Sequence, residues 1–206
     1  MTNLLLLLPV NMTKQRKPRL HVIQDEVDQG ILKRVNGHPV SCHAGCSNCC
    51  QQWVGVMWKE AQEAVAEAAL NGFIIDRQEL AKQARMALDP SIKREDWFGT
   101  KCIFLSAKGT CGAYSRRPIS CRAVLVASSP RECGNPKGRV LRYNTLGTPE
   151  KPGPVMKGFS QMRTEHQTTN TPDTVAALPL YVDMVLRNQK PERLGDKMRP
   201  GGIIGA

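Results

Sequence analysis

The chain has 206 residues, of which 41% are hydrophobic but only 5% aromatic, and a formal charge of +11 at pH 7. This length fits one domain with tails, and the shortage of aromatic side chains predicts a modest hydrophobic core. No run approaches the roughly 20 apolar residues that span a bilayer. The apolar residues 4–8 lack a preceding positive charge and stop at Pro9, unlike a secretory leader. We therefore expect a cytoplasmic protein without a membrane partner.

The first part of the chain predicts a tail and then a helix. Residues 1–19 carry four basic side chains without apolar periodicity, which is typical of a flexible basic arm. From Leu20 to Val35, apolar residues recur at steps of three and four, and Gly37 offers a stop. This pattern predicts an amphipathic helix that leads into the cysteine-rich residues 38–50.

The next segment predicts a short strand and two helices. Residues 51–58 are rich in apolar side chains and could form a short strand that leaves the cysteines, and we expect Trp53 and Trp58 to shield the neighbouring cysteine core. A face of small residues from Ala61 to Ala68 predicts a helix in close contact with a neighbour. Asp76, three residues before Glu79, is a favourable start for a second helix, whose expected inner face ends at Leu88. The glutamates of both helices, Glu60, Glu63, Glu67 and Glu79, are expected to face solvent.

The second half begins with a further cysteine block. Residues 102–105 predict a strand, Lys108 and Gly109 a turn, and Cys111 the returning arm of a hairpin. Pro118 suits the first turn of a helix that contains Cys121, where the helix dipole and neighbouring arginines would favour a thiolate. The overall prediction is a small α+β fold with a metal-stabilised cysteine core, a hairpin and several helices, and irregular tails.

The domain plan follows from these patterns. Residues 20–136 are expected to form the cysteine-cluster metal-binding domain. Residues 137–170 are rich in Gly, Pro, Thr and Lys, which predicts an extended linker. Residues 171–206 are expected to form a C-terminal helix, divided or kinked at Pro179, and a glycine-rich tail.

Eight cysteines form two groups, four within nine residues and four beginning about fifty residues later. In a cytoplasmic protein, clustered cysteines more often bind metal than form disulfides, although free buried thiols and disulfides remain alternatives. Thiolates favour zinc, copper(I) and iron–sulfur clusters. The predicted metal ligands are Cys42, Cys46, Cys49, Cys50, Cys102, Cys111, Cys121 and Cys133.

The number of metal centres depends on the adjacent pair Cys49 and Cys50. Neighbouring side chains tend to point apart, so we expect two close centres that each take one of the pair. Two zinc sites with four sulfurs each, or one iron–sulfur cluster with the other thiols structural or on a second metal, both fit. His38 and His43 are alternative nitrogen ligands.

The sequence contains few motifs for functions other than metal binding. No phosphate-binding or dinucleotide-binding glycine motif is present, and no group of side chains predicts catalytic residues, so an enzymatic role stays open. His166 lies in polar sequence and is expected to be solvated. Residues 104–206 hold 16 Lys and Arg against 7 Asp and Glu. This basic half allows a nucleic-acid partner, although part of the excess would offset thiolate charge.

The cysteine pattern of residues 40–136 resembles the CxxCxxCC family of zinc- or iron-chelating proteins, and most closely its YkgJ-like branch. The resemblance includes the eight cysteines in order, Arg117-Pro118, and Cys133-Gly134-Asn135. It implies a small bacterial or phage-borne protein that binds zinc or iron through these cysteines, without implying a reaction. The gap between Cys42 and Cys46 is three residues, where the family pattern has two.

Overall fold

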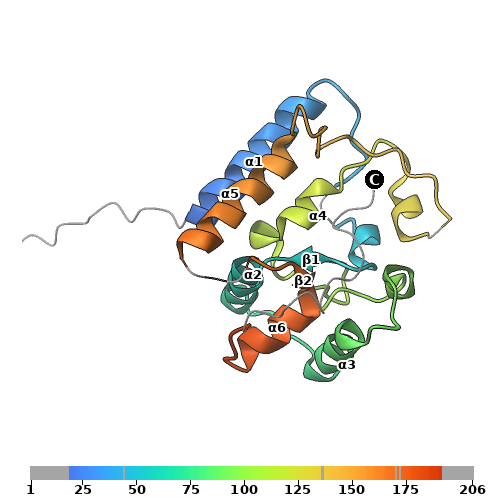
Figure 1. Cartoon of the computed structure of the whole chain (residues 1–206). Coiled ribbons are helices and arrows are strands. Elements are labelled where there is room, and N and C mark those ends of the chain that lie inside the picture. The colour runs from blue at the N-terminus through green and yellow to red at the C-terminus, as the bar shows by residue number, and fades with distance from the viewer. Residues whose placement is uncertain (1–18, 44, 136, 170, 172, 192–206) are drawn as a thin grey trace, which may run out of the picture.

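The computed structural model describes residues 19–43, 45–135, 137–169, 171 and 173–191. Within these ranges the protein has six α-helices and one two-stranded antiparallel sheet (Figure 1). The expected basic arm before Arg19 and the glycine-rich tail lie outside the described residues. The elements are α1 (Arg19–Val35), β1 (Gly55–Val56), α2 (Trp58–Leu70), α3 (Arg77–Leu88), α4 (Ile119–Ala123), α5 (Pro154–Thr168), β2 (Ala176–Ala177) and α6 (Leu178–Leu186).

Helices α1 and α5 lie side by side along one edge of the molecule (Figure 1). The apolar stripe predicted from Leu20 to Val35 is buried along its length, which confirms this helix. The two helices approach closely at glycines. A Cβ on Gly158 would lie 2.3 Å from Val27 Cγ2, and one on Gly30 would lie 2.6 Å from Pro154 Cβ. Larger side chains at either glycine would therefore force the helices apart.

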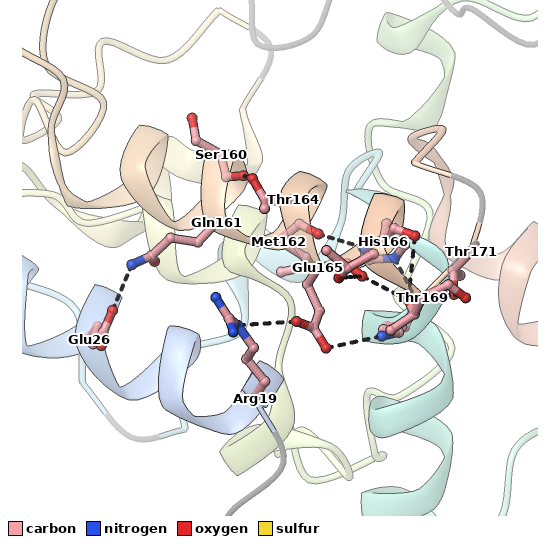
Figure 2. A network of polar contacts seen from close by, with 12 residues as sticks. Arg19, Glu26, Ser160, Gln161, Met162, Thr164, Glu165, His166, Thr169 and Thr171 are labelled. Atoms are coloured by element: carbon pink, nitrogen blue, oxygen red, sulfur yellow. Dashed lines mark hydrogen bonds and ion pairs between the residues drawn. The ribbon is translucent and has the colours of Figure 1, made fainter.

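Polar contacts extend the α1–α5 pairing, as Figure 2 shows. Gln161 donates to Glu26 at 2.8 Å, and Arg19 pairs with Glu165 at 3.1 Å. His166 is fully buried, with Nδ1 2.7 Å from the Met162 carbonyl and Nε2 accepting from the Lys59 amide at 3.4 Å. The expectation of a solvated His166 is thus wrong. Burial lowers the pKa of His166, so the imidazole is held neutral.

The larger hydrophobic cluster lies where α2 and α3 pack against α6. The predicted alanine face is confirmed, because Ala61, Ala64 and Ala68 have no exposed surface. Trp58 meets Tyr181 of α6 edge-on, with ring centroids 5.4 Å apart. Trp58 is therefore part of the core, and Trp53 lies instead beneath the Arg94 guanidinium, 5.7 Å from its ring centre.

The start of α3 agrees with the prediction, whereas the strand after the first cysteines and the inner face of α3 differ from it. Asp76 caps α3 by accepting from the amides of Gln78 and Glu79, at 2.8 and 3.0 Å. The predicted strand after the first cysteines shrinks to β1, which pairs with β2 in the register Gly55 to Ala177 and Val56 to Ala176. Leu88, expected on the inner face of α3, is 59% exposed.

The structure corrects two predictions about the last third of the chain. The segment 137–170 is not an extended linker throughout, because it contains α5, which starts with Pro154 in its first turn. The C-terminal helix starts only at Leu178 and not near Asp173, since residues 176–177 form β2. Pro179 therefore lies in the first turn of α6, where its missing amide costs nothing, and does not kink the helix.

Candidate metal centre

The first four cysteines lie on a loop and a short turn between α1 and β1. The amide of Cys46 donates to the His43 carbonyl at 3.1 Å, and Cys50 then donates to Ser47 at 2.9 Å. The second of these bonds belongs to the turn that contains the 3-10 helix Asn48–Cys50. Gly45 has φ +83°, a left-handed conformation that favours glycine. The Cys50 thiol lies close enough to Cys49 to raise the pKa of the Cys49 thiol.

The second cysteine block folds back onto this loop. The predicted hairpin is present as one antiparallel bridge between Leu105 and Cys111. Its base is tied to the first block, because the amide of Cys102 donates to the Cys50 carbonyl at 2.8 Å. Its tip also faces that block, since a Cβ on Gly109 would lie 3.5 Å from Ser47 Oγ. Backbone contacts thus bring together cysteines about fifty residues apart in the sequence.

Cys121 and Cys133 approach from other segments. Cys121 lies in the middle of α4, which Pro118 precedes as the N-cap, as the sequence predicted. The neighbouring Ser120 hydroxyl donates to the Gly55 carbonyl at 2.6 Å and joins α4 to β1. Cys133 is 6% exposed and lies on the 3-10 helix Pro130–Gly134, which contacts the Asn48–Cys50 turn. The other seven cysteines are half-buried.

Electrostatic interactions show that thiols from the two blocks are neighbours. Burial raises the pKa of Cys121 well above its ordinary value, and the thiols of Cys102, Cys49 and Cys111 raise it further. Burial also raises the pKa of Cys133, with added contributions from Cys49, Cys42 and Cys46. Cys49 takes part in both groups and is therefore the central thiol of the cluster.

Backbone amides and one arginine favour the charged form of these thiols. The Phe104 backbone offers a hydrogen bond to Cys102, and the Ala113 backbone offers one to Cys111, each two residues beyond its cysteine. Burial still dominates, and it raises the pKa of Cys102 to about 12. The pKa of Cys49 is raised, chiefly by the Cys50 thiol and by burial, and that of Cys111 is raised chiefly by burial, while the charge of Arg117 opposes both shifts. Amides and cations directed at sulfur are what a bound thiolate needs.

The donor set fits zinc or iron, although the side chains are not arranged around an ion. Among the residues the structure describes, no three His, Cys, Asp or Glu side chains already form a group that could hold a metal. Eight soft donors that share one neighbourhood, with amides directed at several of them, nevertheless match thiolate-binding metals. Metal binding would also remove thiol protons, which the buried neutral cluster otherwise retains.

The histidines proposed as alternative ligands lie on the exposed loop. His38 and His43 are both exposed, and the His38 ring lies 6.3 Å from the Tyr143 ring. His166 lies on α5 and takes part in the helix contacts described above. Neither exposed loop histidine lies in the buried part of the cysteine-rich region.

One buried acid beside the site was missed from the sequence. Glu60 has no exposed surface, which makes the expectation of a solvated side chain wrong. It accepts from the Met57 amide at 2.9 Å and from the Ile119 amide at 2.6 Å. Burial raises the pKa of Glu60 to about 7, against those two hydrogen bonds and the charge of Arg122, which lower it. A helix start at Trp58 would have marked Glu60 as a capping residue.

Arg122 makes structural contacts around the same helix. Its side chain is 3% exposed and pairs with Asp28 of α1. It also donates to the carbonyls of Arg117 at 3.0 Å and Ser115 at 2.8 Å. Part of the basic excess in the second half of the chain is therefore used inside the protein.

Comparison with known proteins assigns the cysteine-rich region to a family. Residues 41–138 match the family model CxxCxxCC, described as a putative zinc- or iron-chelating domain. No curated protein and no solved structure matches the chain. None of the described helices has the length and apolar character needed to cross a membrane. The matched region spans all eight cysteines, and this part of the chain therefore matches the CxxCxxCC family model.

Proposed function

We propose that this protein is a cytoplasmic metal-binding protein whose eight cysteines hold zinc or iron in two neighbouring centres. The observation that supports this most is that the two cysteine blocks lie against each other, with the Cys102 amide donating to the Cys50 carbonyl at 2.8 Å and the helical turn of Cys133 contacting that of Cys49 and Cys50. Cys49 and Cys50 are adjacent in one turn, and we expect their sulfurs to enter two different but neighbouring centres. Backbone amides at Cys102 and Cys111 supply the hydrogen bonds that thiolate ligands require.

In this proposal the metal has a structural role first. A centre closed by sulfur alone leaves no position for a reacting water, which favours structural, redox or metal-handling roles over hydrolysis. The described hydrophobic clusters draw on few aromatic residues, so cross-linking by metal would add to a modest core. The protein's own residues place the sulfurs, supply amide donors and partly exclude water.

The test is anaerobic purification followed by elemental analysis of the native protein and of Cys121→Ser. We expect at least one zinc or iron per chain, and a lower metal content in Cys121→Ser. Ser160→Ala is the control, because Ser160 is exposed on α5 and its replacement keeps every sulfur and the contacts of α4. Native protein without bound metal after reconstitution with zinc or with iron would contradict the proposal.

The same preparation separates zinc from an iron–sulfur centre. Iron–sulfur protein is brown, with absorbance at about 400 nm from sulfur-to-iron charge transfer. Zinc-loaded protein is colourless. An iron–sulfur-dependent protein-modifying activity and nucleic-acid binding through the basic half stay separate predictions. A flat dependence of DNA or RNA binding on salt would remove the nucleic-acid prediction.

A further inference from the structure

We propose that Glu60 is a positioning residue for Cys121, which it holds in place through the first amide of α4. This inference rests on the proposed metal-binding function. The two oxygens of the Glu60 carboxylate have different partners. Oε2 accepts from Met57 at the start of α2, and Oε1 accepts from Ile119 at the start of α4.

The bond to Ile119 determines where Cys121 lies. Helix α4 has only five residues, so it has few internal hydrogen bonds to fix its position. Ile119 is its first residue, and Cys121 follows two positions later within the same turn. A shift at Ile119 would therefore displace the Cys121 sulfur. Because Ile119 and Glu60 have no exposed surface, water cannot readily replace the lost bond.

Arg122 restrains the other side of Cys121. Its guanidinium is attached to Asp28 and to two carbonyls of the preceding loop. Two groups thus restrain the backbone around Cys121: the Glu60 carboxylate holds the helix start before it, and the guanidinium of Arg122, the next residue, holds the chain after it. This arrangement matches the outer contacts of metal sites, which orient a ligand without touching the metal.

The experiment compares Glu60→Gln with Glu63→Gln in the full chain. Glutamine has nearly the same shape, but its amide nitrogen cannot accept from Met57 or Ile119. Glu63 lies on the same helix, is part-exposed and pairs with His21 at 2.7 Å. We expect Glu60→Gln to weaken zinc binding, measured by chelator competition, by about 10- to 100-fold. Glu63→Gln should bind zinc as the native protein does.

A second readout separates positioning from a general loss of stability. Cobalt(II) replaces zinc and reports ligand geometry through its absorption bands. In folded Glu60→Gln, these bands should shift or lose intensity. Val182→Ala removes a buried side chain of α6 from the larger hydrophobic cluster, which does not include Met57 or Ile119, so it should lower stability but leave the bands unchanged. Native cobalt bands and native affinity in folded Glu60→Gln would overturn the inference.

Glu60→Asp keeps the experiment decisive if Glu60→Gln does not fold. Aspartate retains the charge but is one methylene shorter, so it cannot reach both amides. Weaker zinc binding and altered cobalt bands are again expected, and native values would overturn the inference. If the native protein binds none of zinc, cobalt and iron, the proposed function itself fails. If it binds zinc and cobalt and every Glu60 variant does too, only the role of Glu60 fails.

Discussion

The two sides of the cysteine cluster are held by different means. We call Cys102, Cys111 and Cys121 the core-anchored thiols, because the first two pack on the larger hydrophobic cluster and the third lies on α4. We call Cys42, Cys46 and Cys133 the loop-borne thiols. They lie on residues 41–47 and on a 3-10 helix, and none belongs to a hydrophobic cluster among the described residues.

Because of this difference, we expect some of the cysteines to stabilise the fold through metal and the others to exchange metal. The core-anchored thiols move only if the packing around them moves. The loop-borne thiols depend on a few backbone bonds, such as Ser41 to Val126 at 2.9 Å. Segments with few apolar contacts open at low free-energy cost. We therefore expect metal on the core-anchored side to stabilise the fold, and metal on the loop-borne side to exchange.

The largest expected effect is that of Cys121→Ser. Because a structural metal contributes its binding free energy to folding, loss of this ligand should remove metal and stability together. The free energy of unfolding should fall by about 4 kcal/mol or more, measured by urea denaturation of the holo-protein. Unchanged metal content and stability would contradict the assignment of Cys121 as a ligand.

Cys42→Ser should have a smaller effect on stability. It should also lower metal content, but the free energy of unfolding should fall by only about 2 kcal/mol, since its loop is not packed on a core. The same urea titration measures it. A loss equal to that of Cys121→Ser would mean that both sides are held equally firmly.

Two glycine-to-alanine substitutions compare the packing of the core-anchored and loop-borne sides without removing a sulfur. A Cβ on Gly112, beside Cys111, would lie 2.3 Å from Phe73 Cγ, so Gly112→Ala should cost about 2–3 kcal/mol in unfolding free energy. Gly45→Ala in the loop meets no atom within 4 Å and should cost about 1 kcal/mol, from its positive φ alone. Asparagine at this position should cost less than alanine. Thermal unfolding that ranks the two alanine variants in reverse would contradict the comparison.

The smallest effect is a dependence on pH through His166, which supports α2 next to Glu60. Burial lowers the pKa of His166 in the folded protein, so the unfolded chain takes up a proton first as pH falls. The stability that neutral His166 supplies is present above its ordinary pKa of about 6.5 and is lost below it. The urea midpoint of unfolding should decrease from pH 8 to pH 5.5, and this decrease should be smaller in His166→Gln than in the native protein. Equal decreases in the two proteins would contradict this role.

The sequence predicts the parts of the fold that carry a clear local signal. The stripe of α1, the alanine face of α2 and the Asp76 cap follow from periodicity and capping chemistry. Helix α5 is hidden because its contact with α1 requires small residues such as Gly158, which read as loop residues. Strand β2 has only two alanines, and its pairing with β1 depends on contacts more than a hundred residues apart.

In the candidate site, too, some features are predictable from the sequence and others depend on tertiary contacts. The eight cysteines are evident from composition and spacing, and the matched family model spans all of them. Their grouping around Cys49 is a tertiary property that spacing alone cannot give. Glu60 reads as a surface charge and Arg122 as a cation beside the Cys121 thiol, and only the tertiary packing shows that Glu60 is buried and that Arg122 pairs with Asp28.

The most direct test of the two-sided cluster is the time course of metal release from anaerobically purified protein to excess chelator. The account predicts two phases, with the fast phase lost in Cys42→Ser and the slow phase retained. Gly45→Asn, which keeps every sulfur, is the control and should keep both phases. Release of all bound metal in a single phase, unchanged by Cys42→Ser, would contradict the account.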